Sequence, residues 1–72
     1  MMESNEYGLS LLLEDVGYVR VRLDGKDLHS VKSLAGKAFH LPVVNSVCVF
    51  DNSGVARLYL KKTLDGVIRE ER

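Results

Sequence analysis

Residues 43–60, VVNSVCVFDNSGVARLYL, contain the pattern that most restricts how this chain can fold. A dense apolar run is followed by Asp51-Asn52-Ser53-Gly54 and then by an alternating run. Asp, Asn and Ser side chains bond their own backbone locally, and Gly54 can adopt a positive φ without steric cost, so these four residues predict a turn. The segment therefore predicts a β-hairpin that the rest of the chain covers, extends or pairs with.

The two strands of this hairpin differ in their side-chain patterns. The return strand alternates between an apolar set, Ala56, Leu58 and Leu60, and a second set, Val55, Arg57, Tyr59 and Lys61. A period of two predicts that the first set faces a core and the second faces water. The outgoing strand is apolar on both sides, with Val43, Val47 and Val49 on one side and Val44, Cys48 and Phe50 on the other. Apolar side chains on both sides are typical of a strand that is covered on both faces.

Alternation also predicts two strands near the N-terminus, and a change of period predicts one helix. Residues 7–14 and 18–23 each alternate, and the short connection at 15–17 joins them as a first hairpin. From Asp27 onward six apolar residues share one helical stripe: Leu28, Val31, Leu34, Ala35, Ala38 and Phe39. Asp27 can cap the start of this helix, and Pro42 cannot continue it.

The C-terminal residues 63–71 fit two structures. Asp65-Gly66 is a strong signal for a two-residue hairpin, which would return residues 67–71 as a fifth strand with Glu70 opposite Lys61. Alternatively, a short helix begins at this point, but a glycine in its first turns and its short length disfavour it. We favour the strand.

These elements predict an α+β fold: a small antiparallel or mixed sheet of four to five strands with one helix packed on one face. The order is ββαββ or ββαβββ, and a small all-β barrel is the alternative if residues 23–26 form a β-turn. The 72 residues form one domain, with residues 1–6 expected to be a disordered leader. A chain of this size buries only roughly 60% of the surface that its unfolded form exposes, so it gains from a partner subunit.

Charge and composition point to a soluble chain and to no particular ligand. Ten basic and ten acidic residues give a formal net charge of zero, which indicates neither a polyanionic partner nor a mimic of one. We expect no membrane association, because no apolar run is long enough to span a bilayer and the N-terminus is too polar for a secretory signal. A single cysteine fits a reducing compartment, so we expect a cytoplasmic protein.

The residue types that carry catalysis or bind metals are few and poorly spaced. His29 and His40 lie roughly 16 Å apart along the predicted helix, so one chain cannot place both on one metal ion. Cys48 lies on the most apolar strand and is better explained as a small buried hydrophobe than as a nucleophile. The sequence therefore predicts no catalytic, cofactor-binding or metal-binding residues. An enzyme or metal protein would need His29, His40 or Cys48 from different subunits.

One helix covers one face of a sheet, so apolar side chains remain on the other face. The candidate interface residues are Leu12, Cys48 and Phe50. We therefore expect a small non-enzymatic binding or regulatory protein that forms a homodimer or larger homo-oligomer and acts through protein–protein contacts. The alternative is a nucleic-acid-binding protein, or a partner surface, that uses Tyr18, Arg20, Arg22, Arg57, Tyr59 and Lys61. Arginines interleaved with tyrosines can hold single-stranded nucleic acid by stacking and phosphate contacts.

Overall fold

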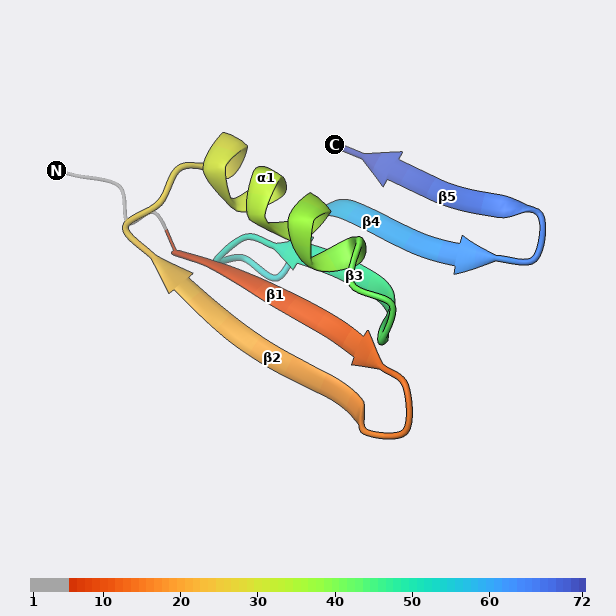
Figure 1. Cartoon of the computed structure of the whole chain (residues 1–72). Helices are drawn as coiled ribbons and strands as arrows, with labels where there is room; N and C mark the ends of the chain where they lie inside the picture. Colours follow the sequence, from red (N-terminus) through yellow and green to blue (C-terminus); the bar gives the residue numbers. More distant parts are fainter. Residues whose placement is uncertain (1–5) are drawn as a thin grey trace, which may run out of the picture.

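The computed structural model describes residues 6–72 and contains one sheet and one helix (Figure 1). The elements are β1 (Glu6–Leu13), β2 (Gly17–Asp24), α1 (Leu28–Phe39), β3 (Val44–Phe50), β4 (Ala56–Thr63) and β5 (Gly66–Glu71). Every pairing is antiparallel, and the strand order is β2-β1-β3-β4-β5. The predicted α+β class and the order ββαβββ are confirmed. The sheet is open, with β2 and β5 at its edges, so the barrel alternative is wrong.

The predicted leader of residues 1–6 falls mostly outside the described residues. Residues 1–5 are not described, and Glu6 already belongs to β1, where it pairs with Asp24. The prediction is therefore wrong at Glu6, because pairing with the end of β2 extends the first strand by one residue.

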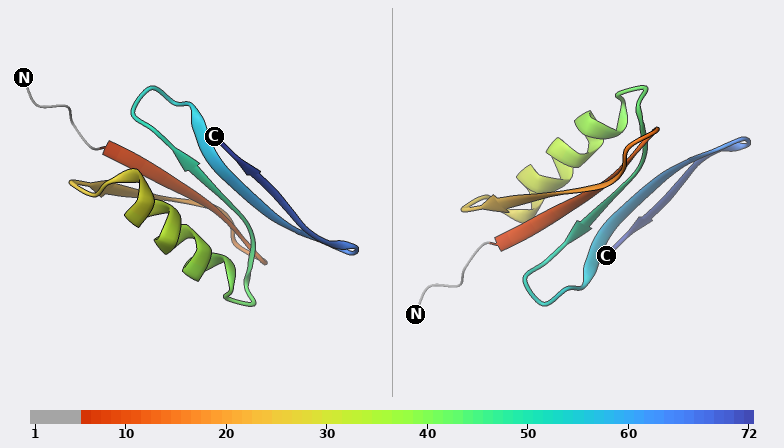
Figure 2. Two further views of the ribbon diagram at one scale, coloured as in Figure 1. Left: turned by 90° about the horizontal axis from the view of Figure 1, so that it is seen from above. Right: turned by 90° about the horizontal axis from the view of Figure 1, so that it is seen from below.

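The core lies between α1 and one face of the sheet (Figure 2). It consists of Val31, Ala35 and Phe39 from the helix and Leu9, Val44, Val47, Val49, Leu58 and Leu60 from the strands. The helix contacts β3 and β1, the strands in the middle of the sheet. A helix about 10 Å wide covers about two strands, so all six residues of β5 are exposed. Contact between α1 and β5 is made by the long side chain of Lys32, whose ammonium lies 2.9 Å from the Glu71 carboxylate.

Both ends of α1 form as the residue types predict. Asp27 is the N-cap, and its side chain accepts a hydrogen bond of 2.7 Å from the backbone N–H of Ser30. This hydrogen bond lowers the pKa of the Asp27 carboxyl. At the other end His40 is the C-cap, and its backbone N–H donates to the carbonyls of Lys37 and Ala38, which completes the last turn.

The turn between β3 and β4 also matches its prediction. The Asp51 carboxylate accepts hydrogen bonds from the N–H groups of Ser53, at 2.9 Å, and Val55, at 3.0 Å. Gly54 has a φ of 81°, which a residue with a side chain adopts at a cost. The Asp51 side chain thus closes the central hairpin, and its hydrogen bond from Val55 lowers the pKa of its carboxyl.

Val44 lies on the opposite face from the one that alternation predicts. Leu12 pairs with Ser46 and Leu13 pairs with Val44, so Asn45 is an extra residue that bulges out of β3. Because of the bulge, each side chain that precedes Asn45 lies on the face opposite to the one that uninterrupted alternation gives. Val44 is therefore only 1% exposed in the helix-covered core, whereas Val43 is 52% exposed.

Deleting Asn45 is expected to preserve the fold and to change the free energy of unfolding by no more than about 1 kcal/mol. The deletion makes the pairing of Leu12 with Ser46 and of Leu13 with Val44 continuous, and Val44 stays in the core. Urea unfolding followed by circular dichroism measures the change. Deleting Ser10 from the regular strand β1 is the control, because it turns Leu9 away from the helix and should cost at least about 3 kcal/mol. Equal costs for both deletions would contradict the bulge.

The C-terminal hairpin forms, with a register that differs from the predicted one. Thr63 pairs with Gly66 and Lys61 pairs with Ile68, so Glu70 lies opposite Tyr59. The turn is centred one residue earlier than predicted. The Thr63 hydroxyl stabilises it by donating to the carbonyl of Gly66, at 3.0 Å, and by accepting from the backbone N–H of Asp65, at 3.2 Å. The two-residue shift in register leaves every side chain on its predicted face. The helical alternative for residues 63–71 is wrong.

Candidate interaction surface

The face of the sheet opposite α1, which we call the open face, is built from residues that alternate with the core residues. Leu9, Val49 and Leu58 are buried beneath the helix, so their neighbours Ser10, Cys48 and Tyr59 project to the other side. Within residues 6–72 the only helix packs on the core side, and no other element covers the open face (Figure 2).

Backbone register arranges the open face in rows that run across the strands. The central row crosses all five strands in the order Arg20, Ser10, Cys48, Tyr59 and Glu70. A second row runs parallel to it and contains Tyr18, Leu12, Ser46, Lys61 and Ile68. On the other side of the central row lie Arg22, Gly8 and Phe50.

The three candidate interface residues lie together on the open face. Leu12 is on β1, whereas Cys48 and Phe50 are on the adjacent strand β3, and all three side chains are partly buried. Tyr59 continues the patch onto β4, where it pairs with Cys48. These four residues form what we call the apolar patch of the open face.

The six residues of the predicted Tyr/Arg face do not form one cluster. Tyr18, Arg20 and Arg22 lie on the edge strand β2, and the remaining three belong to β4. Because β1 and β3 lie between β2 and β4, the two groups are roughly 14 Å apart at a strand spacing of about 4.8 Å. Alternation alone cannot reveal this distance, because it depends on the strand order.

Two of the four predicted cations on this face are already paired within the chain. Arg22 bonds to Glu6 at 2.9 Å and to Asp24 at 3.0 Å, and the hydrogen bond to Asp24 is the main reason that the pKa of Arg22 is raised. Arg57 is the extra residue of a bulge in β4, and its guanidinium lies 3.6 Å from the Asp51 carboxylate. These carboxylates reduce the positive potential that a nucleic acid would meet.

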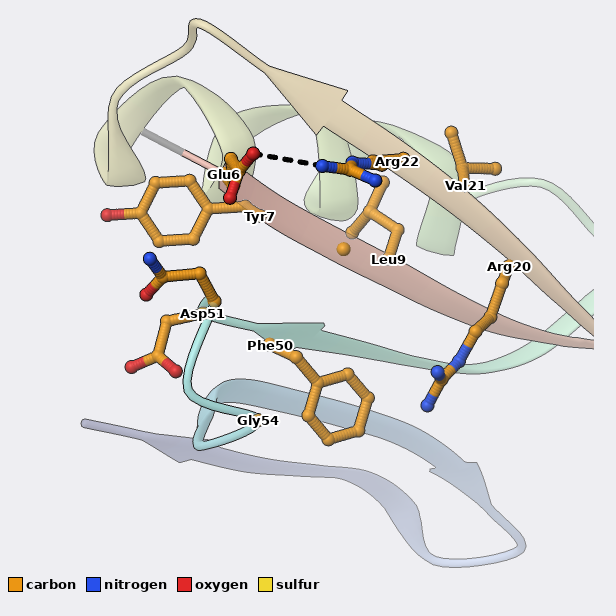
Figure 3. A pocket seen from close by; sticks show the side chains of 11 residues that line it. Glu6, Tyr7, Leu9, Arg20, Val21, Arg22, Phe50, Asp51 and Gly54 are labelled. Atoms are coloured by element: carbon orange, nitrogen blue, oxygen red, sulfur yellow. Dashed lines mark hydrogen bonds and ion pairs between the residues drawn. The ribbon is translucent and has the colours of Figure 1, made fainter. Parts of the chain in front are cut away.

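Arg20 and Glu70, at the two ends of the central row, make no ion pair with any of residues 6–72. The guanidinium of Arg20 lies over the ring of Phe50, 5.6 Å from its centroid (Figure 3). Sequence analysis missed Glu70 as a functional candidate, because its place in the row follows from the register of β4 with β5. The alternation of β5 does put Glu70 on the same face as Ile68, but alternation does not show which residue of β4 lies opposite Glu70.

Gly8 lies between Arg22 and Phe50 in its row and has no side chain. A hollow of about 480 Å³ opens here, between Arg22 and Phe50 (Figure 3). Its lining includes the cations Arg20 and Arg22 and the carboxylates Glu6 and Asp51. Since Glu6 and Asp51 already neutralise neighbouring arginines, the lining favours no particular class of ligand.

The residues considered for chemistry lie far from one another. His29 and His40 are exposed at the two ends of α1, on the other side of the sheet from Cys48. Burial raises the pKa of the Cys48 thiol, which keeps it protonated and weakly nucleophilic. Residues 6–72 contain no group of three side chains that could hold a metal ion.

Comparisons with protein-family models, with curated proteins and with solved structures found no match. The one helix within residues 6–72 is too short to cross a membrane. The functional proposal therefore depends on the geometry of the open face.

Proposed function

We propose that this chain is a small, non-enzymatic binding protein that acts through protein–protein contacts and assembles as a homo-oligomer through the open face. The observation that carries the proposal is the apolar patch of Leu12, Cys48, Phe50 and Tyr59, which lies on the central strands without a covering element among residues 6–72. Contiguous apolar surface at the centre of a face, surrounded by charged residues, is typical of protein interfaces.

The size of the open face supports a dimer. Five strands about 4.8 Å apart, with six to eight residues spaced by about 3.3 Å, give a flat area of roughly 550 Å² per copy. Two copies in contact would bury about 1,100 Å², which exceeds the approximately 1,000 Å² expected of a specific interface. Corrugation by side chains increases the accessible area further.

The charges of the open face favour a second copy of the chain as the occupant. Among residues 6–72 of this face, Arg20 on β2 and Glu70 on β5 make no ion pair, so one copy can complement another. A strongly basic or acidic face would instead require a different partner. The expected location is the cytoplasm, where reducing conditions would keep Cys48 a free thiol inside the interface.

Substitution of Leu12 by Glu tests this proposal. We expect the wild-type chain to sediment at about twice the mass of one chain at micromolar concentration. Leu12→Glu should raise the dimer dissociation constant at least about tenfold, because it replaces an apolar contact by a carboxylate that must lose its water in the apolar patch. Sedimentation equilibrium over a range of concentrations measures the dissociation constants of the wild-type chain and of the variant.

Val16→Glu is the matched control for Leu12→Glu. Val16 is 70% exposed in the β1–β2 turn and lies off the apolar patch, so the same change should leave the dissociation constant unaltered. Circular dichroism establishes that both variants fold. A wild-type chain that remains monomeric up to about 1 mM, a concentration at which even weak complexes form, would refute the proposal.

The alternative function, binding of single-stranded nucleic acid, has weaker support. Only Arg20 and Lys61 of the predicted cations lack an ion pair among residues 6–72, and they lie on β2 and β4. A fluorescent oligonucleotide is therefore expected to show no change in anisotropy at low salt. A rise that falls steeply with added salt and disappears when Arg20, Arg22 and Arg57 are replaced by Ala would favour the alternative.

A catalytic or metal site shared between subunits is the least favoured function. Pairing through the open face would leave both α1 helices on the outside of the assembly, with His29 and His40 a whole sheet away from Cys48. Such an assembly would not bring these three residues to one metal ion or one substrate.

A further inference from the structure

We propose that two copies pack open face to open face about a two-fold axis that runs parallel to the strands and passes over Cys48. In this arrangement Arg20 of each copy forms an ion pair with Glu70 of the other. The inference rests on the proposed self-association, and it adds the orientation of the copies and the residues that determine it.

The central row carries the argument. It contains one residue from each of the five strands, and Cys48 is its middle member, with Ser10 and Arg20 on one side and Tyr59 and Glu70 on the other. The two edge strands of the sheet are β2, which contains Arg20, and β5, which contains Glu70 (Figure 1). The row therefore has a cation at one end and an anion at the other, equally far from its centre.

Two orientations of a two-fold axis stack identical sheets face to face with their strands aligned. An axis parallel to the strands exchanges the two edges, so β2 of one copy lies over β5 of the other. An axis perpendicular to the strands, in the plane between the sheets, leaves each edge over its own equivalent. The first arrangement sets Arg20 against Glu70 twice, whereas the second sets Arg20 against Arg20 and Glu70 against Glu70.

Electrostatics selects the first arrangement. Opposite charges across an interface attract and set its register, and like charges that face each other oppose association. Neither Arg20 nor Glu70 makes an ion pair within residues 6–72, and in the dimer Arg20 exchanges its contact with the Phe50 ring for the carboxylate of the other copy. The exposed Glu70 carboxylate can accept two N–H bonds from one guanidinium, which is the strongest geometry for such a pair.

The centre of the open face allows the two sheets to approach. Ser46 and Cys48 on β3 have small side chains and lie under the proposed axis, with Phe50 at the end of the same strand. Ser10 on β1 lies opposite Tyr59 on β4 of the other copy, so a small side chain meets a large one. Stacked sheets are separated by about 10 Å, and close contact over the small residues brings the two Cys48 thiols within reach of a short bis-maleimide. Cys48 is the only cysteine in the chain, so the position of a cross-link is unambiguous.

Charge reversal tests the orientation. Arg20→Glu and Glu70→Arg are each expected to raise the dimer dissociation constant at least tenfold, and the double variant should return it to within about threefold of the wild-type value. The single variants change the net charge of the chain by two units in opposite directions, so matched controls are needed. Lys26→Glu and Asp65→Arg make the same changes at exposed positions off the central row and should leave the constant unaltered.

A cross-linking experiment separates failure of this inference from failure of the proposed self-association. Because the Cys48 thiol is weakly nucleophilic at neutral pH, the bis-maleimide is applied at mildly alkaline pH, where a mono-maleimide must first be shown to label the wild-type chain. The wild-type chain should then give a covalent dimer, whereas Leu12→Glu at the same concentration should give little and Cys48→Ala none. A sedimenting dimer without a Cys48 cross-link would mean association through another surface, which overturns the inference and leaves self-association intact.

The charge-reversal series also has an outcome that overturns the inference by itself. If the cross-link forms but the double variant is no tighter than the single variants, the axis does not run parallel to the strands. Circular dichroism and thermal unfolding of every variant ensure that a loss of association is not a loss of folding. Rescue by the double variant cannot come from a structural role of Arg20 alone, because its contact with Phe50 is absent in that variant too.

Discussion

Leu58→Ala is expected to lower the free energy of unfolding by about 2 to 5 kcal/mol, the largest stability effect predicted for a single substitution in this chain. Leu58 is 2% exposed in the middle of β4, where it pairs with Val49 and packs in the core beneath α1. Its replacement removes three carbons and leaves a cavity that a small core cannot fill by relaxing. At 0.05 to 0.15 kcal/mol per residue, total stability is roughly 4 to 11 kcal/mol, so the variant loses a large share of it.

Leu64→Ala is the matched control for this prediction. Leu64 lies in the β4–β5 turn with its side chain fully exposed, so the same chemical change should alter stability by less than about 0.5 kcal/mol. Guanidinium unfolding at one protein concentration measures both variants, because any dimerisation makes the midpoint depend on concentration. A cost below about 1 kcal/mol for Leu58→Ala would mean that the core is not packed as described.

Ala35→Leu is expected to lower the free energy of unfolding by about 1 to 3 kcal/mol. Ala35 is completely buried on the face of α1 that contacts β3, between the levels of Val31 and Phe39. Three additional carbons at this contact push the helix away from the sheet or force neighbouring side chains out of their rotamers. Thermal unfolding monitored by circular dichroism at 222 nm, the helical band, measures the loss.

Gly36→Ala provides a control of opposite sign at the next residue. Gly36 has an ordinary helical φ, and a Cβ added there would have no heavy atom within 4 Å outside its own helix. Alanine should therefore stabilise the helix by about 1 kcal/mol. A stabilising Ala35→Leu would show that the helix and sheet are not in close contact at this position.

Most of the secondary structure could be predicted because local chemistry determines it. Asp27 identifies the start of α1, and the turn at 51–54 is specified by an Asp that caps backbone N–H groups and a Gly with positive φ. The side of β3 on which Val44 lies could not be predicted in this way. A bulge leaves the hydrophobic period unchanged on either side of it, so only the pairing with β1 reveals that Asn45 is extra.

Less of the candidate interaction surface could be predicted than of the fold. Alternation placed Leu12, Cys48 and Phe50 outside the helix-covered core, and the structure has them there. The position of Arg20 relative to Glu70 depends on four successive registers, one of which joins β1 to the distant strand β3. No short-range pattern encodes the register of β1 with β3. The turn at Thr63 also shifts the register of β4 with β5 by two residues from the predicted one.

The antiparallel seam between β1 and β3 has a consequence for how the chain reaches its native state. The pairings β1–β2, β3–β4 and β4–β5 join neighbours along the chain, whereas the seam brings residues 8–13 to residues 44–50. Closing that one large loop carries the greatest entropic cost, which α1 reduces by shortening the distance that the connecting segment spans. Substitutions in the seam should therefore slow refolding, while substitutions in the outer hairpin should mainly accelerate unfolding.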